Sequence, residues 1–193
     1  MLKNSVRISG GQWRGRQIAF NPKANSRPTP DRVRETLFNW LMGQIAGARC
    51  LDLFAGSGIL GLEALSRGAT FMCSLEKDTQ TLAGLKAALQ LQQAEPSRWQ
   101  AIQGDAISWL QKAPNAHQTA TAPFDIIFID PPYDANLWAK CLSLVQGQGW
   151  LATDGVIYLE SDRPLMEDIT ATGFGIYKEK KDGGVYAYLI ARK

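Results

Sequence analysis

The sequence has few of the residues from which several common kinds of active site are built. Its only histidine is His117, which excludes two-histidine metal sites and leaves no histidine-based triad unless that residue takes part. His117 lies in the polar stretch Ala113–Pro123 and is expected to be a solvated loop residue. The cysteines Cys50, Cys73 and Cys141 form no Cys-x-x-Cys pair. We therefore expect no disulfide framework and no metal, and we predict three small core residues.

Long apolar segments are also missing. No run of eighteen or more apolar residues occurs, and the opening residues Met1–Ser5 lack the apolar stretch and cleavage site of a signal peptide. We therefore expect a cytoplasmic protein without a membrane partner. Nothing resembles a dimerisation helix, so a monomer is expected. A length of 193 residues with 45% hydrophobic composition suits one domain with a substantial core.

The charge is unevenly distributed along the chain. The net charge is only +3, but residues 1–34 hold eight basic side chains against one acid, and the remaining 159 residues carry a charge of −4. A basic arm on a mildly acidic body favours a polyanionic partner, because each neutralised phosphate releases condensed counterions. The alternative is a flexible, solvated tail. Trp13, Ile18 and Phe20 weigh against that alternative, since they give the arm apolar side chains with which to dock.

The first part of the chain divides into a glycine-interrupted segment and an amphipathic helix. Glycines break the apolar residues of Val6–Phe20, which predicts short strands or a hairpin. A helix is predicted next, because Thr29 can cap it, Pro30 suits its first position and apolar residues recur at helical spacing. We predict a small basic N-terminal extension over residues 1–28 and a main domain over residues 29–193. The apolar residues of the helix are Val33, Leu37, Leu41 and Ile45.

Beyond this helix, short apolar strands alternate with helical stretches. This pattern predicts an α/β fold, a doubly wound and mostly parallel seven-stranded sheet that an antiparallel C-terminal hairpin closes. The hairpin is predicted from two strand-like runs that flank Lys181-Asp182-Gly183-Gly184. The predicted strands are Arg49–Phe54, Phe71–Leu75, Trp99–Gln103, Asp125–Ile129, Val156–Leu159, Gly175–Lys180 and Val185–Arg192, and the helices are Ile59–Arg67, Thr79–Leu91, Ala106–Lys112 and Leu137–Gln146.

A glycine-rich loop, Asp52–Gly61, follows the first of these strands and opens a helix, where α/β folds bind nucleotide-like cofactors. Gly56, Gly58 and Gly61 satisfy the dinucleotide pattern G-x-G-x-x-G, and Glu76 lies 20 residues beyond Gly56, so NAD is one candidate ligand. Asp52 argues against NAD, because its carboxylate would repel a pyrophosphate but could engage the ammonium of a methionine moiety. S-adenosylmethionine is therefore favoured.

Two further acids follow the next two strands. Glu76 ends the second strand and can accept both ribose hydroxyls of either cofactor. Asp105 ends the third strand, where it could face an adenine amino group. Asp105 could equally be the N-cap of the helix that begins at Ala106.

The segment Phe124–Tyr133 is the most informative in the sequence, because an apolar strand ends in Asp-Pro-Pro-Tyr. Pro131 and Pro132 stiffen the loop, so the Asp130 side chain and the Pro131 carbonyl can converge as acceptors on one substrate group. The exocyclic amine of a base is a poor nucleophile, and two acceptors that hold its hydrogens would aim its lone pair at a sulfonium methyl group. Tyr133 would stack on the base, which contributes roughly 1–3 kcal/mol. The alternative is a rigid turn without chemistry.

Paired bases cannot enter such a pocket. The target base must come from a loop or be flipped out of its stack. No strongly basic residue is needed for this positioning, which agrees with the lack of histidine.

These motifs, together with Arg7–Arg16 and Arg27–Leu41, resemble the bacterial 16S ribosomal RNA guanine-N2 methyltransferases called small-subunit methyltransferase D, within the Rossmann-like amino-methyltransferases. The resemblance implies transfer of methyl from S-adenosylmethionine to N2 of one guanine, guanine-966, with S-adenosylhomocysteine as product. It implies 16S RNA, the small subunit or an assembly intermediate as partner. The implied catalytic residues are Asp130, Pro131, Pro132 and Tyr133. The cofactor residues are Asp52, Phe54, Ala55, Gly56, Ser57, Gly58, Glu76, Lys77, Asp105, Ala106 and Asp130, and the RNA contacts are Arg7, Arg14, Arg16, Arg27, Arg32 and Arg34.

Other functions stay open at the level of sequence. The same chemistry could act on adenine or cytosine in DNA or on a glutamine amide of a protein, although the basic N-terminal segment argues against a protein substrate. A different class would be an NAD-dependent oxidoreductase, or a non-catalytic RNA-binding module that retains a cofactor pocket. Arg32 and Arg34 could pair with Asp31 or Glu35 instead of RNA.

Overall fold

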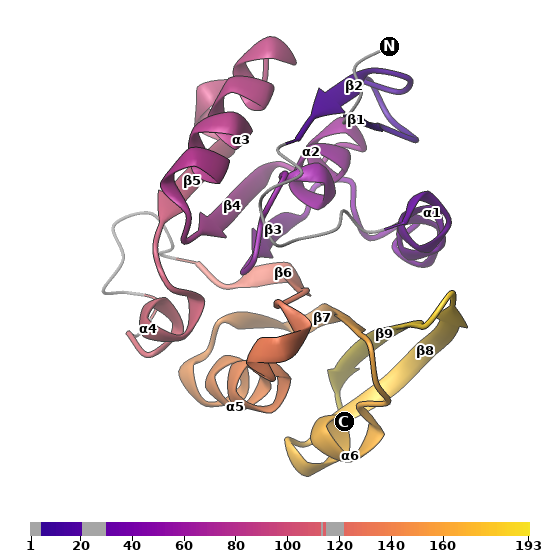
Figure 1. The fold of residues 1–193 in the computed structure, drawn as a ribbon. Coiled ribbons are helices and arrows are strands. Elements are labelled where there is room, and N and C mark those ends of the chain that lie inside the picture. The colour runs from indigo at the N-terminus through magenta and orange to yellow at the C-terminus, as the bar shows by residue number, and fades with distance from the viewer. Residues whose placement is uncertain (1–4, 21–29, 113, 115–121) are drawn as a thin grey trace.

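A single sheet of seven strands forms the centre of the protein (Figure 1). The structure is a computed structural model that describes residues 5–20, 30–112, 114 and 122–193. The spatial order of the strands is β5-β4-β3-β6-β7-β9-β8. Their bounds are β3 (Arg49–Asp52), β4 (Phe71–Glu76), β5 (Trp99–Gln103), β6 (Phe124–Ile129), β7 (Leu151–Ser161), β8 (Phe174–Asp182) and β9 (Val185–Arg192).

The first five strands of this sheet are parallel and confirm the doubly wound prediction. From β3 the chain moves outward through β4 to β5, and it then returns to the other side of β3 for β6 and β7. The strand order therefore reverses between β3 and β6, and a reversal of this kind opens a crevice at the carboxyl ends of the strands. The helices are α1 (Asp31–Trp40), α2 (Ile59–Ser66), α3 (Thr79–Leu91), α4 (Ala106–Leu110), α5 (Trp138–Gln148) and α6 (Met166–Ala171).

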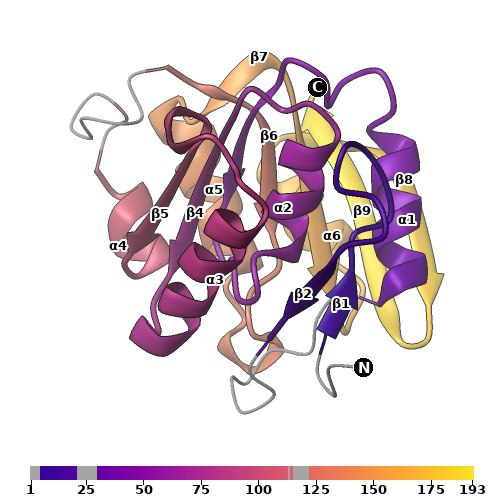
Figure 2. The ribbon, with the colours of Figure 1, turned by 90° about the horizontal axis from the view of Figure 1, so that it is seen from above.

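Helices cover both faces of the sheet, with α1, α2 and α3 on one face and α4, α5 and α6 on the other (Figures 1 and 2). Successive strand residues point to opposite faces, so Cys50 packs with the first group of helices and Leu51 with the second. Burial on both faces explains why the central strands are continuously apolar in the sequence. All three cysteines are free and buried, as predicted.

The predicted antiparallel C-terminal hairpin is confirmed, and the structure also shows the order of its two strands in the sheet. β9 is the last strand in the chain, yet it lies between β7 and β8 and pairs antiparallel with both. The turn between β8 and β9 uses Gly183 at φ 57° and Gly184 at φ 89°, in the left-handed region that glycine adopts at little cost. The two edge strands of the sheet are therefore β5 and β8.

The structure corrects several predicted boundaries. Pro30 is the N-cap of α1 rather than its first helical residue, because its ψ of 141° is extended, and the predicted cap Thr29 lies outside the described residues. The helix ends at Trp40, and the buried Leu41 and Ile45 belong to the turn that follows. β7 begins five residues before the predicted Val156, and the six-residue helix α6 was not predicted. The short 3₁₀ helices η1 (Pro96–Arg98) and η3 (Tyr133–Ala135) are also present among the described residues.

The N-terminal segment forms the predicted hairpin, in which β1 (Ser5–Arg7) pairs antiparallel with β2 (Gln17–Ala19). Its apolar residues Val6, Ile8, Trp13 and Ile18 are buried in the same cluster as α1, α2 and α3. These contacts show that residues 5–20 are docked on the main domain, while the division at residue 28 stays a prediction. None of the helices that the structure describes has the length and apolar character needed to cross a membrane.

Candidate active site

Acidic side chains lie at or just beyond the carboxyl ends of all five parallel strands. The carboxyl ends of parallel strands meet at one edge of a sheet, so these side chains lie along the same edge. Four of the five were predicted from the sequence. In spatial order the residues are Asp105 after β5, Glu76 in β4, Asp52 in β3, Asp130 after β6 and Glu160 in β7.

Asp52 lies on the central strand of the five. It is only 2% exposed, and its Oδ1 accepts the Phe54 amide at 3.3 Å. Burial raises the pKa of Asp52 to about 7, the Phe54 amide opposes that rise and the charge of Glu76 adds to it. A carboxyl group so strongly desolvated is stabilised as a carboxylate when a cation lies beside it. Contact of Asp52 with an ammonium group stays a prediction.

Glu76 holds the glycine-rich loop in position. Its Oε2 accepts the Gly56 amide at 2.8 Å, and its Oε1 accepts the Asp78 amide at 2.8 Å. Each carboxylate oxygen has a second lone pair, so both can still accept a hydroxyl hydrogen. The predicted role of Glu76 toward a ribose is therefore compatible with its part in the loop.

The glycines of this loop are required by the backbone and by packing. Gly56 has φ 50° and Gly58 has φ 76°, where side chains other than hydrogen are strained. A β-carbon on Gly58 would lie 2.1 Å from Cδ1 of Leu85 in α3, and one on Gly61 would meet the side chain of Met72 at 3.1 Å. The loop thus brings α2 close to both β4 and α3. The remaining predicted loop residues, Phe54, Ala55 and Ser57, lie within the same turn.

Asp105 is the N-cap of α4, which confirms one of its two predicted roles. Its Oδ1 accepts both the amide and the hydroxyl of Ser108 at 3.0 Å. These hydrogen bonds, led by that from the Ser108 amide, lower the pKa of Asp105, and Lys77 adds to the effect with its Nζ 3.9 Å from Oδ2. The exposed Lys77 and the buried Ala106 flank this acid. Contact with an adenine stays a prediction.

Asp130 lies at the point where the strand order reverses. It follows β6 directly and is half-buried, beside the strand that ends in Asp52. Burial raises the pKa of Asp130 well above its usual value, and the charges of Glu160 and Asp52 raise it further. Among the described residues, no hydrogen bond is donated to the Asp130 carboxyl or to the Pro131 carbonyl. Both acceptors predicted for a substrate amine are thus available.

The rest of the tetrapeptide, Pro131, Pro132 and Tyr133, leads into η3, which begins at Tyr133. Pro131 is buried, and Pro132 is exposed and caps the short helix. The half-buried Tyr133 ring lies 6.1 Å from that of Trp138, and its hydroxyl donates to Glu160 Oε1 at 3.3 Å. Burial raises the pKa of Tyr133 above its usual range, with Glu160 as the second cause. The hydroxyl therefore stays protonated.

Glu160 is the acid that the sequence did not predict. It is 2% exposed, and its Oε2 accepts the Tyr158 hydroxyl at 2.9 Å. The predicted strand stopped at Leu159, one residue short of it. A glutamate directly after an apolar run, at the edge where the other acids lie, is the only sequence signal that could have indicated Glu160.

The basic residues predicted to contact RNA are placed very differently from one another. Arg7, Arg14, Arg16 and Arg32 are exposed. Arg34 is not, because its side chain is 1% exposed and its Nη2 donates to the Arg7 carbonyl at 2.7 Å and to Asp31 at 3.0 Å. The predicted alternative of an internal ion pair therefore describes Arg34 better than RNA contact does. Arg27 lies outside the described residues.

Arg14 and Arg16 lie far from the acidic edge. The turn between β1 and β2 packs on the last residue of α2, where the Trp13 amide donates to Ser66 Oγ at 2.9 Å. Arg16 Nη1 donates to the carbonyl of Gln92, directly after α3, at 3.4 Å. Both helices begin at the acidic edge, so their final turns are at the opposite edge of the sheet.

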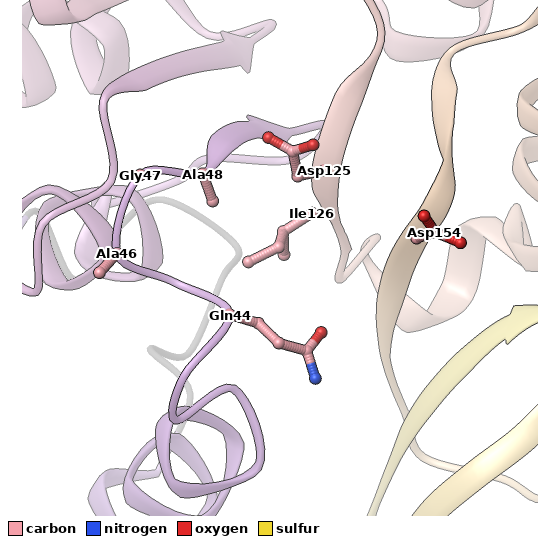
Figure 3. Close-up of a pocket in the computed structure, with 7 residues that line it drawn as sticks. All are labelled: Gln44, Ala46, Gly47, Ala48, Asp125, Ile126 and Asp154. Carbon is pink, nitrogen blue, oxygen red and sulfur yellow. The ribbon is translucent and has the colours of Figure 1, made fainter.

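A pocket of about 350 Å³ also lies at that opposite edge (Figure 3). It is lined by Ala48, which precedes β3, by Asp125 near the start of β6, and by Asp154. Asp125 is already used, since its Oδ2 accepts the Arg49 amide at 2.7 Å. Over the described ranges, no group of three or more His, Cys, Asp or Glu side chains is arranged to hold a metal. None of the predicted site residues lines this pocket.

Comparisons with known proteins show the family of the chain. The family model Conserved hypothetical protein 95 matches residues 6–191. Ribosomal RNA small subunit methyltransferase D of Escherichia coli K12 is 39% identical, over 97% of this chain and 90% of that protein. The protein of the same name from Haemophilus influenzae Rd is 40% identical, over 94% and 91%.

Solved structures give the same result. A putative methyltransferase from Escherichia coli superposes with a TM-score of 0.86 at 38% identity, covering 98% of this chain and 99% of that one. A putative methyltransferase complexed with SAH has a TM-score of 0.72 at 15% identity, covering 98% of this chain and 56% of that one. At that identity the likeness concerns the fold alone.

Proposed function

The chain belongs to the family of ribosomal RNA small subunit methyltransferase D, and on this premise we propose that it methylates a guanine of 16S ribosomal RNA at the exocyclic N2 amine, with S-adenosylmethionine as donor. Activity as a ribosomal RNA methyltransferase follows from the family. What we propose beyond the family is the target: a guanine, its N2 atom, and the position that the sequence resemblance implies. The substrate is 16S RNA, the small subunit or an assembly intermediate.

One observation carries the proposal, namely that the glycine loop and the Asp-Pro-Pro-Tyr segment meet where the strand order reverses. Asp52 ends β3, Asp130 follows β6, and these two strands are neighbours in the sheet. A donor bound at the first element would face an acceptor held by the second. An NAD-dependent oxidoreductase would leave the tetrapeptide without a role.

The residues present fit S-adenosylmethionine. The buried Asp52 carboxyl suits its ammonium, Glu76 suits its ribose hydroxyls, and the backbone around Gly56 and Gly58 has no side chain to obstruct a ligand. Asp105 retains Oδ2 for the adenine side, although its Oδ1 is used by the helix cap. When bound, this group supplies a methyl on a positively charged sulfur.

The protein's own part in the reaction is positioning. The Asp130 carboxylate and the Pro131 carbonyl accept the two amine hydrogens, so the nitrogen lone pair points toward the crevice. Tyr133 holds the base by its ring face, and its hydroxyl is kept away from the base by Glu160. Because burial raises the pKa of Asp130, a positive charge nearby favours its carboxylate form.

Exposed basic residues near the acidic edge are proposed to bind the RNA backbone. Arg32 is in the first turn of α1, and Thr36 of the same helix accepts a hydrogen bond from Lys180 at 2.9 Å. Lys180 pairs across the sheet with Ala187, which pairs in turn with Glu160. Arg32 therefore lies toward the catalytic edge, and Arg7 lies on the strand beside α1. Arg34 is not part of this proposal, because it is buried.

The deciding experiment supplies labelled S-adenosylmethionine and small-subunit particles from cells that lack this activity. We expect label in N2-methylguanine of 16S RNA, and no further incorporation into particles that already carry the mark. Absence of label there, with label in duplex DNA or in a glutamine-containing peptide, would assign the chemistry to another substrate. Calorimetry should detect binding of S-adenosylmethionine and not of NAD.

Replacement of Asp130 separates an enzyme from a binding module. We expect Asp130→Ala to lower turnover by a factor of ~10²–10³ while the affinity for S-adenosylmethionine changes little. Unchanged turnover in this variant would remove Asp130 from the mechanism.

A further inference from the structure

Glu160 ties the catalytic loop to the neighbouring strand. This acid lies near the end of β7, beside the strand that Asp130 follows, and it is 2% exposed. Tyr133 donates its hydroxyl to Glu160 Oε1 at 3.3 Å, and Trp138 donates its indole Nε1–H to the Glu160 carbonyl at 2.8 Å. Tyr133 and Trp138 lie on either side of the turn that follows the two prolines. A single residue of β7 is therefore bonded to both sides of that turn.

A second residue from the same end of β7 supports this connection. Arg163 Nη2 donates to Asn136 Oδ1 at 2.7 Å, and the Arg163 guanidinium lies 5.3 Å from the centre of the Trp138 ring. Asn136 has φ 49°, a strained conformation for a residue other than glycine. The loop from Tyr133 to Trp138 is thus held by three hydrogen bonds from two residues that follow the apolar part of β7.

Glu160 accepts a hydrogen bond at each of its two carboxyl oxygens. Tyr133 and Tyr158 both point a hydroxyl at it, one at each oxygen, and burial together with the Glu160 charge raises the pKa of each tyrosine above its usual range. Both hydroxyls therefore donate, and the acid accepts at both oxygens. A glutamine would offer one acceptor and one NH₂ group, so one of the two tyrosines would face a donor. The hydrogen bonds from the two tyrosine hydroxyls explain why an acid is buried at this place.

We propose that Glu160 is a positioning residue, which fixes the Tyr133 ring and the Asp-Pro-Pro-Tyr turn by accepting the Tyr133 hydroxyl with Tyr158 as its second anchor. This inference rests on the proposed function, because the ring that it fixes is the one on which the target base would stack. The hydrogen bond from Tyr133 to Glu160, called the tether below, determines where the ring lies and leaves the ring face free. A misplacement of about 1 Å at such a site can lower the rate 10²-fold.

Kinetics on four variants test the proposal. Glu160→Gln and Tyr133→Phe both remove the tether while the side chain keeps nearly the same size. Tyr133→Phe also keeps the aromatic ring face. We expect each to lower kcat by a factor of ~10–100, and the double variant to be no slower than the slower single one. The matched control is Tyr188→Phe, which deletes a buried hydroxyl that accepts the Leu165 amide at 3.3 Å and should leave kcat unchanged.

Two outcomes of the kinetics would overturn the inference. Wild-type kcat in both tether variants would show that the ring is held by other contacts. Multiplied losses in the double variant would show that the two residues act independently, so that the Tyr133–Glu160 hydrogen bond is not the route of the effect.

A readout without substrate keeps the inference separate from the proposed function. Amide hydrogen exchange over Tyr133–Leu137 should be faster in Glu160→Gln than in the wild type, and unchanged in Tyr188→Phe. If the wild type transfers no methyl to ribosomal RNA, the proposed function fails, and this exchange measurement still decides the tether. Equal exchange in wild type and Glu160→Gln would refute the tether even if the enzyme is active.

Discussion

The buried carboxyl group of Asp52 couples cofactor binding to the stability of the protein. Its pKa is about 7 in the folded chain, and the ordinary value of an aspartate is 3.8. Because the folded state holds the proton more tightly, the stabilisation is complete below the unfolded pKa and is lost as the pH rises through about 7. A cation bound beside Asp52 would reverse this loss.

We therefore predict that Asp52→Asn flattens the pH dependence of folding. Between pH 5 and pH 8 the free energy of unfolding of the wild type should fall, and Asp52 should account for ~2–4 kcal/mol of that fall. Urea unfolding at several pH values measures this, in the absence of ligand. A wild type that is equally stable at both pH values would contradict the prediction. The variant should also lose affinity for S-adenosylmethionine.

Residues at strand ends could be predicted because their positions follow from the strand pattern. Asp52, Glu76 and Asp130 each end a short apolar run, and the parallel topology then places them at one edge. Glu160 could not be found in this way. Its partner Tyr133 is 27 residues away in the sequence, and only the pairing of β6 with β7 brings the two together. The burial of Arg34 could not be predicted for the same reason, since it depends on contacts with the distant β1 and α2.

At the scale of elements, the glycine loop sets how closely α2 approaches α3. Gly58 combines a φ of 76° with a position where a β-carbon would meet Leu85 at 2.1 Å. We predict that Gly58→Ala lowers the free energy of unfolding by ~2–4 kcal/mol, from backbone strain and overpacking together. It should also abolish measurable cofactor binding, because the loop must shift.

Gly84 provides the control for this substitution. It lies inside α3, where a β-carbon would meet nothing within 4 Å. Gly84→Ala should raise the free energy of unfolding by up to about 1 kcal/mol, since alanine is the better helix former. Denaturant unfolding and calorimetry on the two variants give both quantities. Similar stabilities of the two variants would show that the loop is not constrained as described.

The elements that sequence could not predict are those that tertiary contacts define. α6 has six residues, too few for a clear helical period, and its buried Ile169 packs in the core with α5 and β8. β7 begins early because Leu151 pairs with Phe124, although polar residues follow it. By contrast, α3 and β5 were predicted with the bounds that the structure has, since each has a clear period and clear breakers at its ends.

At the scale of the whole molecule, a buried ionic cluster joins the N-terminal hairpin to the main domain. Glu63 of α2 is fully buried and accepts the Ser9 amide at 2.9 Å, the Ser9 hydroxyl at 2.7 Å and Arg67 Nε at 2.9 Å. Arg34 of α1 lies 3.5 Å from the same carboxylate. One acid thus connects the N-terminal hairpin, α1 and α2. Removing its charge takes away the buried countercharge that Arg34 and Arg67 share.

We predict that Glu63→Gln lowers the free energy of unfolding by about 3–5 kcal/mol, the usual effect of breaking a buried ion pair. Proteolysis should then cleave first within residues 5–20, because the hairpin is released before the sheet unfolds. The control is Glu35→Gln, which alters an exposed acid of α1 and should change the stability little. A hairpin as resistant as that of the wild type would show that apolar contacts alone hold it.

The arrangement of the N-terminal hairpin and α1 also determines which basic residues can contact RNA whose target base lies in the active site. Arg32 lies toward the acidic edge, and Arg14 lies in the turn at the opposite edge. With Asp130→Ala as a common background to prevent turnover, we predict that Arg32→Ala weakens RNA binding and lowers the slope of log affinity against log salt by ~0.9, one phosphate contact. Arg14→Ala should leave both unchanged. Equal losses from both variants would mean that the RNA covers the whole N-terminal face, and the bound strand would then have to extend across α2 and not only along the carboxyl ends of the strands.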